Sequence, residues 1–133
     1  MDNVVARLMR YAKVWSESDY HANRGTTPST DRQFDMARLL VEELHGMGVD
    51  NAFVDDTCYV YASLPATPGC EHLPVIGLIA HMDTTPDMTG KDVKPQILHY
   101  DGGDLMLNPE QNIVMRGSDF PELKKFIGQD LVC

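Results

Sequence analysis

Positive charge, paired cysteines and long apolar runs are all scarce in this sequence. Its 11 Lys and Arg residues stand against 20 Asp and Glu residues, a net charge of −9. That charge would repel a phosphate backbone, so we expect no nucleic-acid partner. The three cysteines include no Cys-x-x-Cys pair, which favours reduced thiols in the cytoplasm over a disulfide or zinc-finger framework. No apolar run approaches about 18 residues and the start MDNVVARL lacks a signal-peptide core, so we expect no membrane partner.

Several catalytic signatures are also missing. The chain contains no His-Glu-x-x-His, no phosphate-binding loop, no Gly-x-Gly-x-x-Gly that opens a helix and no Gly-x-Ser-x-Gly. No cysteine has a sequence context that supports a Cys–His nucleophile pair. Any chemistry must therefore be sought in residues outside these patterns.

What is present suits one modest α/β domain. The chain has 133 residues, of which 43% are hydrophobic, enough to form a core. Thr30 and Gln33 are spaced as a capping box, and Gly46 and Gly48 as helix stops. The periodicity predicts helices over 3–17, 29–48 and 120–127, a hairpin over 51–64, a buried strand over 75–80, and short strands at 97–98, 105–107 and 131–132.

The stretch VIGLIAHMDTTPD, residues 75–87, carries the strongest candidate site. Its continuous apolar run is typical of a strand covered on both faces, as in an α/β sheet. His81 and Asp83 are two residues apart, so they would project together at the strand's carboxyl end, where such sheets bind ligands. A metal-bound imidazole usually donates its other N–H to a carboxylate. The spacing alone leaves two readings open, a metal ligand with its orienting carboxylate or a hydrogen-bonded structural histidine.

A second stretch, DGGD at residues 101–104, also places carboxylates around a turn. It could line a cation site, but a tight turn that glycine permits, with solvated acids, is the favoured interpretation.

The strings HMDTTPDMTGKDVKPQI and DGGD, together with STDRQFDMARLLVEELHGMGV and YASLPAT, give the chain a wider resemblance. It is similar over nearly all 133 residues to the peptidase T branch of the M20 family of two-zinc peptidases. The His-x-Asp-Thr motif alone would indicate only the wider M20 group, whereas the extended string is more specific.

The resemblance implies a role for each site residue and for the whole chain. His81 matches the first zinc ligand of the family, and Asp83 matches the catalytic-site carboxylate that supports it. The remaining zinc ligands and the general base would lie beyond residue 133. Residues 1–133 would then be the N-terminal portion of an M20-type catalytic domain, a mixed β-sheet flanked by helices and truncated before the sheet is complete, without the lid domain.

The implied activity is metal-assisted hydrolysis of the N-terminal residue of tripeptides, with two zinc ions in the full-length enzyme. The isolated chain is expected to be inactive, to bind zinc weakly and to self-associate through an exposed sheet edge. Three alternatives stay open: a non-catalytic α/β binding module, another M20 member such as a carboxypeptidase or deacylase, and a degenerate product with an interaction role only.

Overall fold

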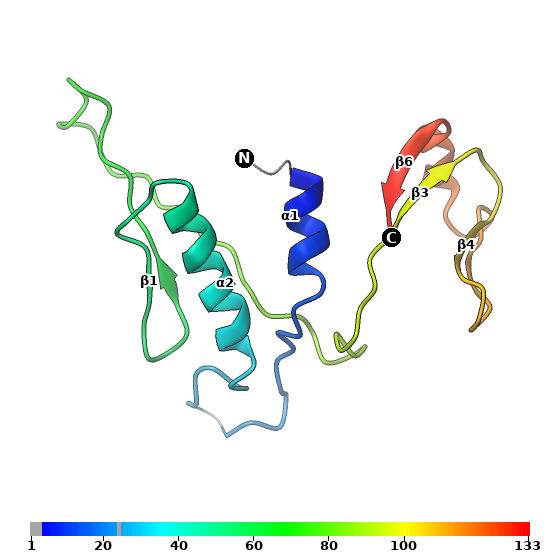
Figure 1. The fold of residues 1–133 in the computed structure, drawn as a ribbon, viewed down its shortest axis with the longest axis horizontal. Helices are drawn as coiled ribbons and strands as arrows, with labels where there is room; N and C mark the ends of the chain where they lie inside the picture. The colour runs from blue at the N-terminus through cyan, green and yellow to red at the C-terminus, as the bar shows by residue number, and fades with distance from the viewer. Residues whose placement is uncertain (1–3, 24) are drawn as a thin grey trace. The chain divides into compact units, whose positions relative to one another are not determined.

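The computed structural model describes residues 4–23 and 25–133, which divide into two compact units, one of residues 10–93 and one of residues 4–9 and 94–133 (Figure 1). The described strands form three two-stranded antiparallel sheets. Two α-helices are followed along the chain by short strands and a 3₁₀-helix, so the predicted mixed α/β class is confirmed. None of the helices within these residues is long and apolar enough to cross a membrane.

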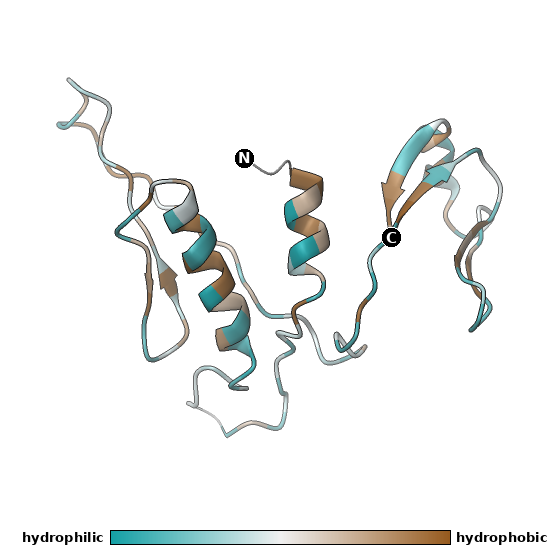
Figure 2. Cartoon of the chain, in the orientation of Figure 1, coloured by the Kyte–Doolittle hydropathy of each residue, from teal (hydrophilic) through white to brown (hydrophobic). Residues whose placement is uncertain are grey.

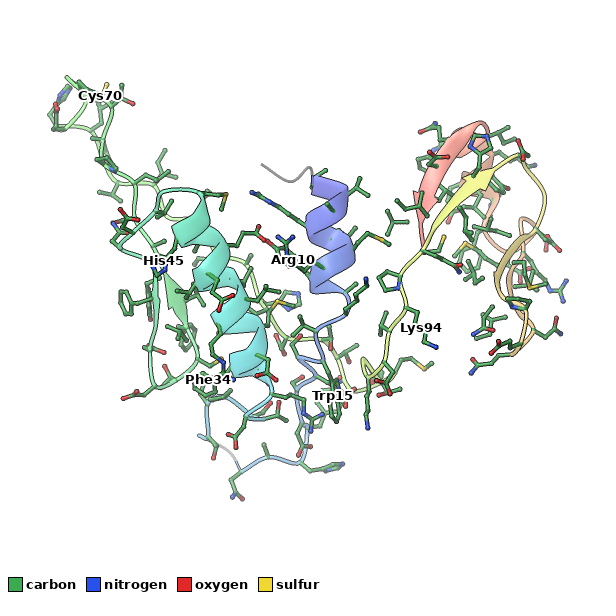
Figure 3. All side chains as sticks on the ribbon, viewed as in Figure 1. Arg10, Trp15, Phe34, His45, Cys70 and Lys94 are labelled. Carbon is green, nitrogen blue, oxygen red and sulfur yellow. The ribbon has the colours of Figure 1, made fainter. Side chains whose placement is uncertain are left out.

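The first helix, α1, spans Val4–Tyr11 and is shorter than the predicted 3–17, of which residue 3 lies outside the described residues. The helix cannot continue to residue 17 because residues 16–18 pair with residues 82–84. Glu17 forms an isolated parallel β-bridge with Thr84, which requires extended backbone. The side chains of Arg10 and Tyr11 reach the Glu43 carboxylate on the next helix (Arg10 is labelled in Figure 3).

That helix, α2, spans Gln33–Gly46 and confirms the predicted central helix. Polar and apolar residues alternate around it (Figure 2), and its buried residues are Met36 and Ala37. It ends where Gly48, at φ +84°, donates its N–H to the carbonyl of His45 at 2.9 Å.

The predicted capping box at the start of α2 is wrong. The Thr30 hydroxyl instead donates to the main-chain oxygen of Glu17 at 2.7 Å, and the Gln33 amide donates to Thr30 Oγ1 at 3.3 Å. The capping residue is Arg32, which makes no side-chain cap hydrogen bond. The Thr30 hydroxyl therefore makes a tertiary hydrogen bond to Glu17 instead of capping the helix.

The predicted hairpin is confirmed as β1, Phe53–Val54, paired with β2, Val60–Tyr61. Phe53 faces Tyr61 across the pair, with ring centroids 5.4 Å apart. Both strands pack against α2, which gives the first unit its helix-on-hairpin core.

The strand predicted over residues 75–80 is wrong. The structure assigns no strand there, and Val75, Ile76, Leu78 and Ile79 are 98%, 85%, 94% and 100% exposed. A strand needs a hydrogen-bonded neighbour, and within the described residues no other strand pairs with this segment. An apolar composition alone is therefore not enough to make residues 75–80 a strand.

The second unit contains β3 (Ile97–Tyr100), β4 (Leu105–Asn108), β5 (Ile113–Met115), the 3₁₀-helix η1 (Pro121–Phe126) and β6 (Gln129–Val132). β3 pairs with β6 and β4 pairs with β5, so the short strands predicted at 97–98, 105–107 and 131–132 are confirmed. The predicted helix at 120–127 is present in 3₁₀ form. The core of this unit is built from Tyr100, Leu105 and Leu123.

Candidate functional site

The candidate site begins with an extended strip, residues 16–18, that pairs with residues 82–84. Thr84 donates its N–H to Ser16 O at 3.3 Å, and Ser18 donates its N–H to Thr84 O at 3.0 Å. The Ser16 side chain is fully buried, and its hydroxyl donates to Met82 O at 3.0 Å. These bonds fix the backbone on both sides of Asp83.

The main-chain carbonyl of Asp83 points away from the strip, because carbonyl directions alternate along an extended chain. Carbonyls two residues apart point the same way and the one between them points the opposite way. Because Met82 O and Thr84 O are both directed at the strip, Asp83 O is directed away from it. That is the side on which the imidazole of His81 lies.

His81 and Asp83 do lie together, although no strand holds them. His81 Nδ1 is 2.9 Å from Asp83 O and 3.2 Å from Asp83 Oδ1. A carbonyl and an ionised carboxylate can only accept, so Nδ1 carries the proton and Nε2 keeps its lone pair. The ring is 85% exposed and Asp83 is 41% exposed, so the free nitrogen faces solvent.

The far end of this loop is tied to the same strip through Glu17. Its carboxylate accepts the Gly90 N–H at 2.9 Å and the Trp15 indole N–H at 3.2 Å, and Arg32 lies 3.5 Å away (Trp15 is labelled in Figure 3). The Gly90 bond above all, then the Trp15 bond, lowers the pKa of Glu17. The Arg32 guanidinium also stacks 3.9 Å over the Trp15 ring. Residues 82–90 are therefore anchored at both ends.

A third contact fixes the middle of the loop. The Tyr20 hydroxyl lies 2.9 Å from Thr85 Oγ1 and 3.3 Å from Asp87 Oδ2, and Thr85 Oγ1 donates to Asp87 Oδ2 at 2.7 Å. These side chains are exposed, so each bond adds modest stability.

The chain offers a metal ion one well-prepared ligand. His81 has the tautomer and the exposure that a metal-binding imidazole needs, with Asp83 in the place of its supporting carboxylate. Across residues 4–23 and 25–133, the structure places no group of three or more His, Cys, Asp or Glu side chains that could hold an ion. A stable zinc site needs three or four ligands, so the described residues supply a part of one.

The other carboxylate-rich stretch is a turn, as predicted. Gly102 and Gly103 adopt φ of +104° and +78°, and Gly103 O accepts the Tyr100 hydroxyl at 2.9 Å. Positive φ is the reason for glycine at both positions.

Sequence reasoning missed Ser16 and Glu17, the two residues that hold the loop in place. Neither has a local signal, because Ser16 bonds to a residue 66 positions away and Glu17 to one 73 positions away. The helix predicted over 3–17 would include Trp15, but α1 ends at Tyr11 and the Trp15 indole N–H donates to Glu17.

Comparison with known proteins gives close relatives for almost the whole chain, although no family model matches it. The chain is 48% identical to peptidase T of Alkaliphilus oremlandii over 99% of its length, 48% identical to peptidase T of Geobacillus kaustophilus over 97%, and 46% identical to peptidase T of Desulfitobacterium hafniense over 99%. It spans only about a third of these relatives, 31–32% of their length. By sequence, the chain is therefore a homologue of the peptidase T proteins over about a third of their length.

Proposed function

We propose that this chain carries one zinc ligand of a tripeptide aminopeptidase and the carboxylate that orients it. His81 Nε2 is the metal-binding atom, and Asp83 holds the ring through Nδ1. The observation that supports this is the hydrogen bond from His81 Nδ1 to Asp83, which leaves Nε2 unprotonated and exposed. Residues 1–133 are then the N-terminal portion of an M20-type catalytic domain, in keeping with their similarity to a third of each peptidase T relative.

The chemistry proposed for the whole enzyme is amide hydrolysis in a soluble cytoplasmic protein. Bound zinc would polarise the scissile carbonyl and lower the pKa of a water molecule. The contribution of this chain is to present one imidazole in a single tautomer, so that no proton has to leave Nε2 when a metal binds. The three free cysteines, Cys58, Cys70 and Cys133, agree with a reducing compartment.

The isolated 133-residue chain should hydrolyse no tripeptide. One imidazole forms one coordination bond, whereas a structural or catalytic site combines three or four. A tripeptidase activity of the purified chain that disappears in His81→Ala would contradict this proposal of an inactive fragment.

Zinc titration followed by NMR of the five histidine rings tests the ligand assignment. The His81 ring signals should shift or broaden at the lowest zinc concentration. The His81→Ala variant should lose that first event, while the matched control His72→Ala, in a loop of the same unit, should keep it. If His81→Ala left the first event unchanged, His81 would not be the zinc ligand.

The partner proposed for the apolar segment 75–79 is a second copy of the chain. Its four large side chains are 85–100% exposed, and no Asp, Glu, Lys or Arg occurs between Glu71 and Asp83. Two copies of a chain with net charge −9 would meet with least repulsion there. In place of the predicted sheet edge, the structure assigns no strand to residues 75–79, and their β-branched residues favour pairing with an identical segment.

Sedimentation over a range of concentrations measures this association. Ile79→Lys should shift the chain toward monomer, and the matched control Leu64→Lys, at a residue 78% exposed outside the segment, should not. A wild-type chain that stays monomeric at high concentration would exclude the proposal.

A further inference from the structure

The largest fully buried side chain that the structure describes is a polar one, Ser16, at 0% exposure. It lies outside the motif that carries the candidate site, 65 residues before His81 in the sequence. Its hydroxyl donates to Met82 O at 3.0 Å, the carbonyl between His81 and Asp83 along the chain. A buried hydroxyl is costly unless it is hydrogen-bonded, so burial ties this side chain to one acceptor.

The consequence reaches the imidazole through one peptide unit. The Asp83 carbonyl shares a planar peptide with the Thr84 N–H, which donates to Ser16 O at 3.3 Å, so Asp83 O points away from the strip and meets His81 Nδ1 at 2.9 Å. The Ser16 hydroxyl holds the other peptide, between Met82 and Asp83, which joins His81 to that acceptor. If the Met82 carbonyl were released, this peptide could rotate, and His81 Nδ1 would no longer be held against Asp83 O.

We propose that Ser16 is a positioning residue that sets the tautomer of His81. It acts on the backbone of Met82 and Asp83 and does not touch a metal or a substrate itself. The proposal rests on the proposed function in one respect, since a fixed tautomer matters most if Nε2 binds zinc. The tautomer itself can be measured without zinc.

Ser18 provides a matched control in the same strip. Its hydroxyl also donates to a carbonyl of the loop, Thr84 O, at 3.1 Å. However, the Ser18 main-chain N–H donates to that same oxygen at 3.0 Å. Removing the Ser18 hydroxyl therefore leaves the acceptor bonded and the carbonyl direction unchanged.

The experiment is ¹⁵N NMR of the histidine rings of the whole 133-residue chain, free of metal, at about pH 8. In the wild type we expect His81 in the Nδ1–H form. Ser16→Ala should move the ring toward the Nε2–H form. Ser16→Cys, which keeps a weaker donor of similar size, should give an intermediate ratio, and Ser18→Ala should give the wild-type ratio.

A zinc titration then measures the effect on binding. Loss of a direct partner of a metal-bound histidine typically costs 10–100-fold in affinity. Ser16 acts one step further away, so Ser16→Ala should raise the dissociation constant at His81 by roughly three- to tenfold.

Two results would overturn the proposal: a His81 tautomer ratio that is the same in Ser16→Ala and wild type, or an equal change in Ser18→Ala, which would indicate general loosening of the strip. The amide signal of Ser18 shows whether residues 16–18 are still paired with residues 82–84 in each variant. If this pairing weakens in Ser16→Ala, the Ser16→Cys variant, which keeps a weaker donor, still tests the proposal. A tautomer change without any zinc binding at His81 would support the positioning role while refuting the proposed metal function.

Discussion

Replacing Gly117 with alanine should open the second unit, because the new methyl group would meet main chain. A Cβ at this position would lie 2.6 Å from Gly103 O and 3.3 Å from Gly103 C, where ordinary contacts begin at 3.4 Å. One backbone must therefore move by about 0.8 Å, the difference between 3.4 and 2.6 Å. No side-chain rotation can relieve the clash.

The free-energy cost follows from what that movement breaks. Overpacking of this kind costs about 1–3 kcal/mol. Gly103 O also accepts the buried Tyr100 hydroxyl, and loss of that bond adds about 1 kcal/mol. The variant should lose about 2–4 kcal/mol of stability in residues 94–133.

Amide hydrogen exchange measures this loss locally. The protected reporters are the Gly128 N–H, bonded to Tyr100 O, and the Cys133 N–H, bonded to Gln96 O. Their exchange should become at least about 30-fold faster, since 1.4 kcal/mol corresponds to a factor of ten.

Gly46→Ala is the matched control. Gly46 ends α2, and an added Cβ would have nothing within 4 Å. Helix propensity predicts a gain of about 0.5–1 kcal/mol in the first unit. If Gly117→Ala left exchange at both reporters within about twofold of wild type, a change below about 0.5 kcal/mol, the steric reasoning would be refuted.

Three further predictions concern other contacts. The lowered pKa of Glu17 means that its stabilisation of the loop is present above the reference value of 4.5 and is lost as the pH falls through the folded pKa; Trp15 fluorescence should follow this change, and Glu17→Gln should abolish it. The hydrogen bond to Asp130 raises the pKa of His99, so this pair stabilises β3 and β6 below the reference value of 6.5 and stops doing so as the pH rises through the folded pKa; an NMR titration in which Asp130→Asn left the His99 pKa unchanged would contradict this. Leu123→Ala removes a buried core side chain, which should cost about 2–4 kcal/mol by hydrogen exchange in the second unit, and a loss below about 1 kcal/mol would argue against a packed core there.

Elements defined by local signals could be predicted from the sequence. α2 follows from its apolar spacing and from Gly48, which ends it at positive φ. The hairpin follows from two short β-rich runs on either side of Asp55, whose carboxylate accepts the main-chain N–H groups of Thr57 and Tyr59 within the turn. In each case the stabilising contacts lie within a few residues.

Elements that depend on distant partners could not be predicted in this way. Residues 75–80 have the composition of a buried strand, but a strand forms only when a second segment pairs with it. The described residues contain no such partner for this segment. The capping box failed for the opposite reason, because the Thr30 hydroxyl found a distant acceptor in Glu17. Propensity is overridden when a tertiary hydrogen bond competes for the same group.

The candidate site was predictable in its chemistry but not in its support. The two-residue spacing of His81 and Asp83 indicated that their side chains belong together, and the structure brings them to 3.2 Å. Their role as metal ligand and orienting carboxylate stays a prediction. The hydroxyl of Ser16, which governs the peptide between them, has no spacing relationship to either residue and emerges only from the folded chain.

The bond between Ser16 and Met82 closes a loop of 66 residues. Closing so long a loop costs conformational entropy before any local contact repays it, so this junction should form late in folding, after α2 and the hairpin have shortened the effective distance. On a growing polypeptide, His81 would be synthesised well before its surroundings were in order. A chain shortened by its first 18 residues would keep the whole His-x-Asp motif but lose the Ser16 hydroxyl that holds the peptide between its two residues.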